Sequence, residues 1–294
     1  MNSAGKPGAT KITGESHQMD LGPRDESHQQ DELSPLHKEK FYRARILQRR
    51  DIADDLWSIR VERDSDFHFL PGQYATLGVL APHKHIERPY SIASSPYESE
   101  LEFFLELVPR GELTPALHKL QAGDELTIRK VAKGRFTLAL DAAAPRNHLL
   151  LCTVTGLAPY VSYIRALRSD ASQNKFPEGH RLFLIEGASR SWEFGYIDEL
   201  MRIAGEVPWL KYVPTVSRPW EDPNWTGEVG RVDDLIREYT RLWGLTPENT
   251  SVYVCGHPKM IENSHGILLR RGWLKEHIKE EVYFVPKERV AVST

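Results

Sequence analysis

Four consecutive residues, Arg88, Pro89, Tyr90 and Ser91, bring a cation, an aromatic ring and a hydroxyl together in a short β-rich segment. Because alternate residues of a strand face the same side, such a segment can supply all three groups to one ligand. A guanidinium suits a diphosphate, a phenol ring stacks on a flat heterocycle, and a hydroxyl can lie near a polar ring nitrogen. A flavin dinucleotide needs these three groups. An ordinary strand with an exposed arginine and a packed tyrosine explains the same residues equally well.

A second segment runs from Val108 through Gly111 and Leu113 into a short helix. A glycine turn that leads to a helix N-terminus presents free backbone N–H groups to an anion. The sequence predicts Thr114 as the N-cap of this helix and Pro115 as its first residue. A dinucleotide diphosphate fits such a turn, although a plain strand–turn–helix junction is the simpler explanation of this fragment alone.

Two further groups follow apolar runs in the second half of the chain. Thr155 and Gly156 follow the run at 148–154 and precede a helix. A strand–glycine–helix turn at the carboxyl edge of a parallel sheet is where nucleotides bind. Arg190 and Arg218 follow the next two runs, and planar, doubly donating cations suit a 2′-phosphate. NADP(H) is therefore predicted rather than NAD(H), with two solvated surface arginines as the alternative.

The elements that must position these residues differ on the two sides of a linker at 141–147. Before the linker, short β-rich segments predict an antiparallel barrel. After it, apolar runs alternate with helical stretches, which predicts a doubly wound parallel sheet covered on both faces. No internal repeat is evident. The predicted strands are 41–48, 56–63, 73–80, 101–108, 124–131, 148–154, 181–187, 209–216 and 251–256, with a final apolar run at 282–285, and the predicted longer helices are 159–169, 196–205, 231–242 and 258–271.

Length and composition limit the classes of function. The chain has 294 residues, of which 40% are hydrophobic, so it can build two cores of ordinary size. Its net charge of −3 argues against a nucleic-acid partner. No apolar run approaches the ~20 residues that span a bilayer, and no signal peptide is apparent, so no membrane insertion and a cytoplasmic location are expected. Residues 1–37 are predicted to be a disordered tail.

The cysteines and histidines limit the metal chemistry. Cys152 and Cys255 are the only two cysteines, and a plant-type iron–sulfur cluster takes four thiolates. An electron-carrying partner with such a cluster must therefore be a separate protein. His83 and His85 lack a third ligand, so no metal site is expected.

The motifs of the first half, taken in order, resemble the FAD domain of the ferredoxin–NADP reductase family, particularly its bacterial branch. The resemblance implies that Arg88 binds the FAD diphosphate, Tyr90 stacks on the isoalloxazine and Ser91 lies near N5. It also implies that the turn before the short helix cradles the diphosphate. The FAD-binding residues expected in this half, assigned to a domain at 38–141, are Arg88, Pro89, Tyr90, Ser91, Val108, Gly111, Leu113 and Thr114.

The second half, assigned to a domain at 148–294, resembles the NADP(H)-binding part of the same family. Val154 stands where the family's phosphate-binding turn has glycine, so a side chain occupies the space where the backbone usually meets the ligand. The segment around Cys255 resembles the family's Cys-Gly-x-Pro-x-Met strand end. This implies that Cys255 lies against the nicotinamide and that Gly256 lets the ring approach. The remaining residues with implied nucleotide roles are Thr155, Gly156, Arg190 and Arg218, while Tyr283 or Phe284 is expected to cover the flavin or to belong to a core strand.

The resemblance implies an enzyme in which NADPH passes a hydride to N5 of FAD and electrons then leave singly for a ferredoxin or a flavodoxin. We expect Ser91, Cys255 and Glu281 to shape the reaction centre. Three alternatives stay open: an NADH-linked cytochrome b5 reductase-like enzyme, an oxygenase reductase, and an FAD-binding sensor with little turnover. A basic cluster is either a solvated face or a surface that attracts an acidic carrier, and its members are Lys38, Lys40, Arg43, Arg45, Arg49 and Arg50.

Overall fold

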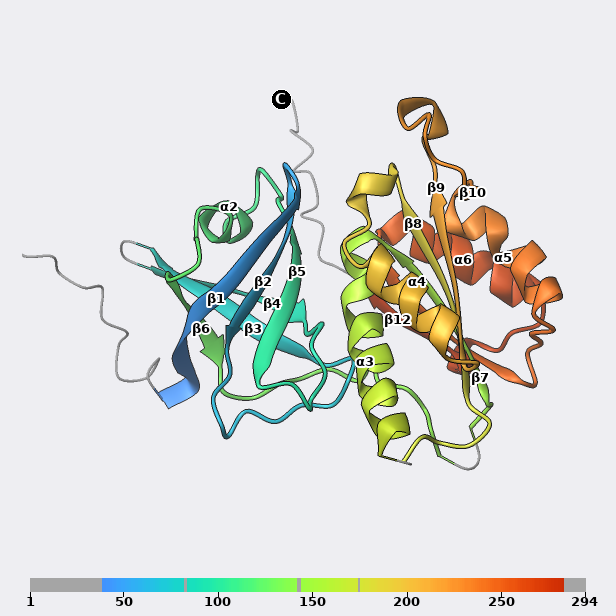
Figure 1. Cartoon of the computed structure of the whole chain (residues 1–294), viewed down its shortest axis with the longest axis horizontal. Helices are drawn as coiled ribbons and strands as arrows, with labels where there is room; N and C mark the ends of the chain where they lie inside the picture. Colours follow the sequence, from blue (N-terminus) through green and yellow to red (C-terminus); the bar gives the residue numbers. More distant parts are fainter. Residues whose placement is uncertain (1–38, 82–83, 142–143, 174, 283–294) are drawn as a thin grey trace, which may run out of the picture. The chain divides into compact units, whose positions relative to one another are not determined.

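The structure is a computed structural model of the chain, and it describes residues 39–81, 84–141, 144–173 and 175–282. Within these ranges the strands form two six-stranded sheets, one from each half of the chain (Figure 1). The predicted tail at 1–37, together with Lys38, lies outside the described residues. So do Tyr283 and Phe284, and the prediction that one of them covers the flavin stays a prediction.

The first sheet is antiparallel, with the strand order β4–β3–β6–β1–β2–β5. Just past β4, the backbone N–H of Ala93 donates to the Glu102 carbonyl of β5 over 2.8 Å, which brings the two edge strands together. The sheet is therefore barrel-like, as the sequence predicts. Its strands are β1 (Phe41–Ala53), β2 (Leu56–Glu62), β3 (Tyr74–Ala81), β4 (Lys84–Ser91), β5 (Glu100–Glu106) and β6 (Glu125–Arg129).

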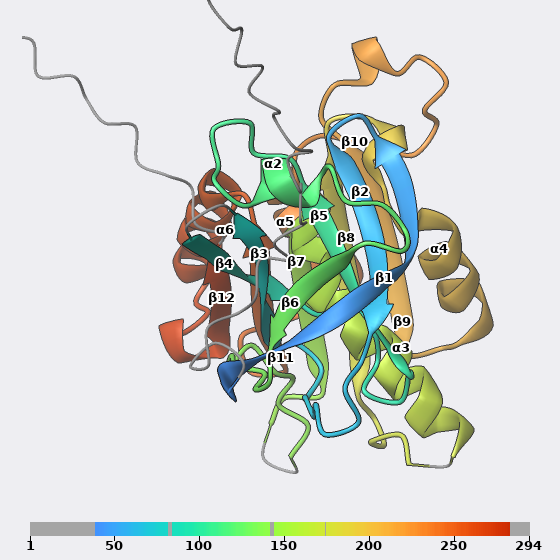
Figure 2. The same ribbon diagram turned by 90° about the vertical axis from the view of Figure 1, so that its left-hand side faces the viewer.

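Alternate side chains of the paired strands point into the interior of this sheet and fill it. In the pairing of β2 with β5, Trp57 lies opposite Leu105 and Ile59 lies opposite Phe103. All four side chains are buried in one apolar core. Burial of each such side chain contributes about 1.5–3 kcal/mol. The helix α2 (Thr114–Leu117) lies across one end of the sheet (Figure 2). It begins at Thr114, so the N-cap is Leu113 and not Thr114 as predicted.

The second sheet is parallel throughout, with the strand order β10–β9–β8–β7–β11–β12. The chain builds outward from β7 to β10 and then crosses to the other side of β7 with β11. The predicted doubly wound sheet is thus confirmed, with its switch point between β7 and β11. The strands are β7 (Asn147–Thr153), β8 (Arg181–Ala188), β9 (Leu210–Val216), β10 (Glu228–Val229), β11 (Thr250–Gly256) and β12 (Ile278–Val282).

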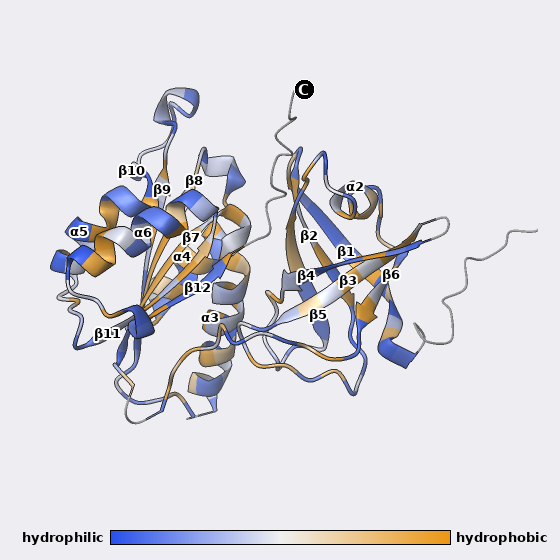
Figure 3. Cartoon of the chain, turned by 180° about the vertical axis from the view of Figure 1, so that it is seen from behind, coloured by the Kyte–Doolittle hydropathy of each residue, from blue (hydrophilic) through white to orange (hydrophobic). Residues whose placement is uncertain are grey.

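Within the described ranges, four long helices cover the parallel sheet, two on each face (Figure 1). The helices α3 (Ala158–Ser172) and α4 (Ile197–Glu206) pack on one face. The helices α5 (Val232–Leu242) and α6 (Pro258–Arg270) pack on the other. Because both faces are covered, the central strands are almost continuously apolar (Figure 3). Among the described helices, none has the length and apolar character that crossing a bilayer requires.

Candidate functional site

The turn after β7 packs directly against the end of β11 at the switch point. A Cβ added to Gly156 would lie 2.4 Å from the Cys255 carbonyl oxygen. A Cβ added to Gly256, whose φ is +127°, would lie 2.4 Å from the Thr153 hydroxyl oxygen. That hydroxyl also accepts a hydrogen bond from the His257 N–H over 2.9 Å. Both predicted glycines are therefore required by the contact between two segments of the chain itself.

Val154 keeps a backbone conformation that glycine adopts freely. Its φ is +44°, and no other non-glycine residue in the described ranges has a positive φ. An L-residue in the left-handed region costs about 1–2 kcal/mol, and a branched Cβ makes the conformation more unusual. The side chain packs against Ala188 and Val216, which end β8 and β9, and against Phe194. The departure from the family's glycine thus leaves the turn in place and adds an apolar side chain beside it.

Three strands bring the predicted reaction-centre residues together. The hydroxyl of Ser91, at the end of β4, donates to Oε2 of Glu281 in β12 over 2.8 Å. Glu281 lies opposite Cys255 in the register between β12 and β11. Ser91 is 5% exposed and Cys255 is fully buried. Burial raises the pKa of the Glu281 carboxyl, and the hydrogen bond from Ser91 only partly offsets this rise. The group therefore joins the two sheets at the carboxyl edge of the parallel one.

The alternation of β4 separates Ser91 from its two predicted partners. Arg88 and Tyr90 share one face of the strand, and Ser91 lies on the other. The expectation that one side of β4 supplies all three groups is therefore corrected. Tyr90 packs against the barrel core, and burial raises its pKa to about 12. The exposed Arg88 guanidinium forms an ion pair with Glu112 over 3.0 Å, and Lys84 reaches the same carboxylate over 2.7 Å.

The turn before α2 is closed by its own hydrogen bonds. The Thr114 hydroxyl oxygen accepts from the Val108 N–H over 3.0 Å, and the hydroxyl lies 3.2 Å from the Val108 carbonyl, to which it donates. The Gly111 N–H donates to the same carbonyl over 2.8 Å. Leu113, the next predicted contact, is 2% exposed and belongs to the barrel core. Thr114 and Leu113 thus maintain the shape of the turn, and Val108 and Gly111 lie at its open side.

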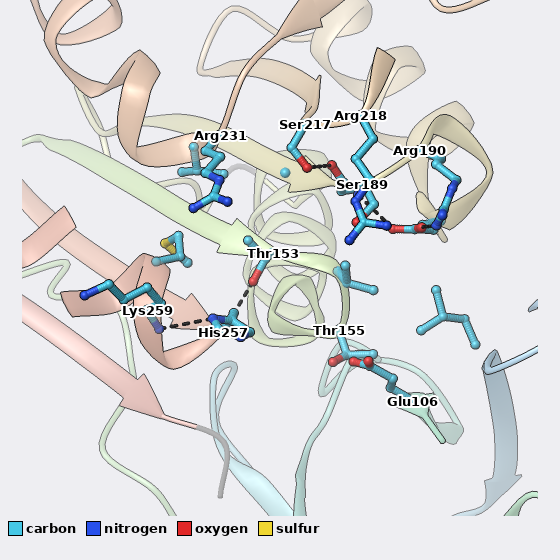
Figure 4. Close-up of a pocket in the computed structure, with 18 of the residues that line it drawn as sticks. Glu106, Thr153, Thr155, Ser189, Arg190, Ser217, Arg218, Arg231, His257 and Lys259 are labelled. Carbon is cyan, nitrogen blue, oxygen red and sulfur yellow. Dashed lines mark hydrogen bonds and ion pairs between the residues drawn. The ribbon is translucent and has the colours of Figure 1, made fainter. Parts of the chain in front are cut away.

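A cleft of about 1250 Å³ lies along the carboxyl edge of the parallel sheet. Figure 4 shows Arg190, Arg218 and Arg231 along one side of it and Lys259 on another, with Thr153 between them. These four cations come from the segments that follow β8, β9, β10 and β11. A cleft of this size with clustered cations fits a phosphorylated dinucleotide. Arg231 and Lys259 carry no predicted role, although both follow a strand as Arg190 and Arg218 do.

Acidic side chains that the sequence prediction missed hold the two predicted phosphate-binding arginines. The Arg190 guanidinium contacts Glu221 through Nε over 2.7 Å and Glu193 through Nη1 over 3.0 Å. Arg218 lies 3.7 Å from the same Glu221 carboxylate. A short repeat gives the signal: Ser-Arg-x-Trp-Glu occurs at 189–193 and again at 217–221. The expectation of no internal repeat is therefore corrected at this small scale.

The four arginines of the predicted basic cluster lie in β1 and make contacts within the chain. The Arg49 side chain is only 6% exposed and donates to the carbonyls of His118 and Leu120. Arg50 donates to the Gly195 carbonyl. These contacts hold both guanidinium groups against the backbone of the chain, although a carbonyl acceptor leaves the positive charge in place. The two remaining arginines form ion pairs with acidic residues of adjacent strands, Arg43 with Glu125 and Arg45 with Glu62.

Comparisons with known proteins match both halves of the chain. Residues 43–138 match the family model described as Oxidoreductase FAD-binding domain, and residues 150–265 match Oxidoreductase NAD-binding domain. The chain is 31% identical over 243 residues to a ferredoxin–NADP reductase of Pseudomonas aeruginosa, covering 78% of this chain and 89% of that protein. It is 32% identical over 222 residues to a flavodoxin/ferredoxin–NADP reductase of Rhodobacter capsulatus, covering 70% and 77%. A solved ferredoxin NADP+ reductase from Neisseria gonorrhoeae with bound FAD and NADP superposes with a TM-score of 0.72 at 26% identity, covering 83% of this chain and 99% of that one.

Proposed function

The chain belongs to the ferredoxin–NADP reductase family, and we propose that it exchanges electrons between NADP(H) and a separate one-electron carrier, either a ferredoxin or a flavodoxin. It is a flavin-dependent oxidoreductase, and its cofactors are FAD and NADP(H). The chemistry that bound FAD supplies is hydride exchange with NADP(H) at N5 and single-electron exchange with the carrier. The proposal takes the carrier as a separate protein, and the two cysteines support this for a ferredoxin, since a plant-type cluster takes four thiolates. A cytoplasmic location stays a prediction.

One observation carries the proposed reaction centre: the 2.8 Å hydrogen bond from Ser91 of the barrel to Glu281, beside Cys255. In the proposal, Ser91 and Cys255 border the reacting rings. Glu281 is a positioning residue, since its carboxyl group fixes the direction in which the Ser91 hydroxyl points. Burial of the Ser91 and Cys255 side chains also excludes water from this point.

We assign the two cofactors to the two parts of the chain. FAD is proposed to bind within residues 38–141 and NADP(H) within 148–294. The exposed cation of Arg88 at the barrel edge and the cation-lined cleft on the parallel sheet support this division. The FAD-binding residues proposed are Arg88, Pro89, Tyr90, Ser91, Val108, Gly111, Leu113 and Thr114, and those for NADP(H) are Thr155, Gly156, Arg190, Arg218, Cys255 and Gly256.

Anaerobic stopped-flow mixing tests the reaction centre. The double variant Ser91→Ala/Cys255→Ala is expected to slow flavin reduction by NADPH by roughly tenfold or more, because both groups bordering the rings are lost. Cys152→Ala is the matched control, since Cys152 is equally buried on the adjacent strand and is expected to leave the rate unchanged. A double-variant rate within about twofold of the wild type would remove both residues from the reaction centre.

The carrier is tested in the same apparatus. The NADPH-reduced protein is mixed separately with a ferredoxin, a flavodoxin and cytochrome b5. Rapid reduction of either of the first two, and not of cytochrome b5, is the expected result. Selective reduction of cytochrome b5 would contradict the proposed carrier.

A further inference from the structure

The two copies of the Ser-Arg-x-Trp-Glu repeat form neighbouring turns at the ends of β8 and β9. In each copy the arginine precedes a single 3-10 turn, formed by Ser191–Glu193 in the first and by Pro219–Glu221 in the second. Backbone hydrogen bonds tie the turns together: the Arg218 N–H donates to the Ser189 carbonyl over 3.1 Å. The Ser191 N–H donates to the Asp222 carboxylate over 2.7 Å. The two arginines are thereby held on one side of the cleft.

The glutamates that end the two copies have different partners. Glu193 is anchored within its own turn, because its Oε2 accepts from the Ser189 N–H over 2.8 Å. In the second copy, the corresponding backbone donor, the Ser217 N–H, is already bonded to the Ala188 carbonyl over 3.0 Å. Within the described part of the chain, the Glu221 carboxylate hydrogen-bonds or pairs only with the side chains of two arginines, Arg190 and Arg218. Glu221 is also the more exposed of the two carboxylates, at 35% against 13%.

Glu221 occupies the edge of Arg190 that would bind a phosphate. The guanidinium directs Nε and Nη2 together at Glu221, and Nη1 at Glu193. Two parallel N–H donors on one edge are what arginine uses to hold a phosphate. A 2′-phosphate and the Glu221 carboxylate therefore need the same two donors. Glu193 leaves that edge free while it fixes the orientation of the guanidinium.

We propose that Glu221 is a built-in competitor for the 2′-phosphate of NADP(H). It lowers the preference of the site for NADP(H) over NAD(H), and Glu193 is a positioning residue for Arg190. This inference rests on the proposed function, because it takes Arg190 and Arg218 as the residues that bind the 2′-phosphate. It goes beyond that function because it assigns the size of the preference for NADP(H) over NAD(H) to Glu221, the carboxylate of the second repeat.

Calorimetric binding to the full chain tests the inference without turnover. The two probes are adenosine 2′,5′-bisphosphate and adenosine 5′-monophosphate, which differ only in the 2′-phosphate. Glu221→Gln is expected to tighten binding of the bisphosphate, because the variant lacks the carboxylate that competes for Arg190, and to leave binding of the monophosphate unchanged. The expected gain is roughly three- to tenfold, since the competing carboxylate is partly exposed and water weakens its ion pair. Glu193→Gln is expected to weaken the bisphosphate, since Arg190 then loses its anchored partner.

Glu206→Gln is the matched control, because it removes the same charge from an exposed carboxylate on α4 that pairs with Arg168 and Arg202. It is expected to leave both affinities unchanged. Arg190→Gln distinguishes a failure of the competitor role of Glu221 from a failure of the 2′-phosphate site itself. If this variant collapses the preference for the bisphosphate while Glu221→Gln leaves or lowers it, the competitor role is overturned alone. If both Arg190→Gln and Arg218→Gln leave the preference at its wild-type value, the 2′-phosphate assignment itself is wrong.

Discussion

A buried carboxyl group inside the parallel sheet shows how far a single residue departs from its ordinary chemistry. Glu186 lies in β8 and is fully buried, opposite Cys152 in the register with β7. Its Oε2 accepts a 2.5 Å hydrogen bond from the Tyr212 hydroxyl, while its Oε1 has no hydrogen-bond partner among the described residues. Burial, partly offset by this hydrogen bond, raises the pKa of Glu186 to about 8. The carboxyl group is therefore protonated at neutral pH.

This raised pKa predicts a pH dependence of stability. The pKa of the same carboxyl in the unfolded state is near 4.5. Below that pH both the folded and the unfolded state are protonated, and the contribution of Glu186 to stability is fully present. As the pH rises from 4.5 to about 8, the unfolded state loses the proton first and stability falls by up to about 1.4 kcal/mol per pH unit. Glu186→Gln removes this slope. Urea unfolding of both proteins from pH 5 to pH 9 should show wild-type stability falling relative to the variant, and parallel curves would contradict the raised pKa.

The strained backbone of Val154 predicts an unusually mild substitution. Val154→Gly relieves the cost of about 1–2 kcal/mol for a left-handed L-residue, and this relief offsets the lost apolar contacts. We expect the free energy of unfolding to change by less than about 1 kcal/mol. The control is Val213→Gly, at a partly buried position of β9 with no such strain, which is expected to cost about 2 kcal/mol or more. Equal losses in chemical unfolding would show that the turn is unstrained.

At the scale of elements, an ion network fastens α3 to the barrel and to α4. Arg165 of α3 donates to Glu102 of β5 over 2.6 Å and to both carboxylate oxygens of Glu199 over 2.8 and 2.7 Å. The Tyr196 hydroxyl donates to the other Glu102 oxygen over 2.9 Å. The Glu102 and Arg165 side chains are 6% and 14% exposed. Because water screens this network little, its members depend on one another more than surface pairs do.

Replacing Arg165 with an uncharged residue should therefore lower the free energy of unfolding. Arg165→Met is expected to destabilise the protein by about 2 kcal/mol, because the buried Glu102 carboxylate then keeps only one of its two cationic partners, Arg60 at 2.9 Å. Adding Glu102→Gln to that variant should recover part of the loss. Arg168→Met, which breaks an exposed pair with Glu206 on the same helix, is expected to cost under about 1 kcal/mol. Similar losses for the two arginine variants in urea unfolding would contradict the role assigned to the network.

The sequence predicts best those elements that are buried on all sides, because their consecutive apolar residues form a recognisable run. The run at 148–154 predicts β7 to within one residue at each end, since both of its faces are covered. The edge strands lack that constraint. Most positions of β4 are exposed or half-buried, and β3 holds it by backbone pairing, so β4 is absent from the predicted strands. For the same reason β12 (Ile278–Val282) begins four residues before the predicted apolar run at 282–285.

In the candidate site, too, the residues that can be predicted are those that follow an apolar run. Arg190 and Arg218 are predictable because each follows an apolar run, so the sheet itself brings them to one edge. The carboxylates that hold them are not, because the contact of Glu221 with Arg190 joins separate turns. The hydrogen bond between Ser91 and Glu281 joins residues 190 positions apart in the chain, and only the family resemblance indicates their association.

For the whole molecule, the fold brings two partial sites to one place. Strand β4 of the barrel ends at Ser91, and the switch point of the parallel sheet lies beside Cys255 and Glu281. The cation-lined cleft opens along the same carboxyl edge. This arrangement supports the proposal that each part of the chain binds one cofactor and that the reaction takes place where the two parts meet.

The most direct test of this account is an anaerobic titration of the purified, FAD-loaded protein with NADPH and, separately, with NADH, followed by its visible flavin absorbance. We predict flavin bands that bleach at much lower concentrations of NADPH than of NADH. Bleaching by NADH alone would keep the fold and contradict the nucleotide assignment. A colourless protein that fails to bind added FAD would contradict the central claim.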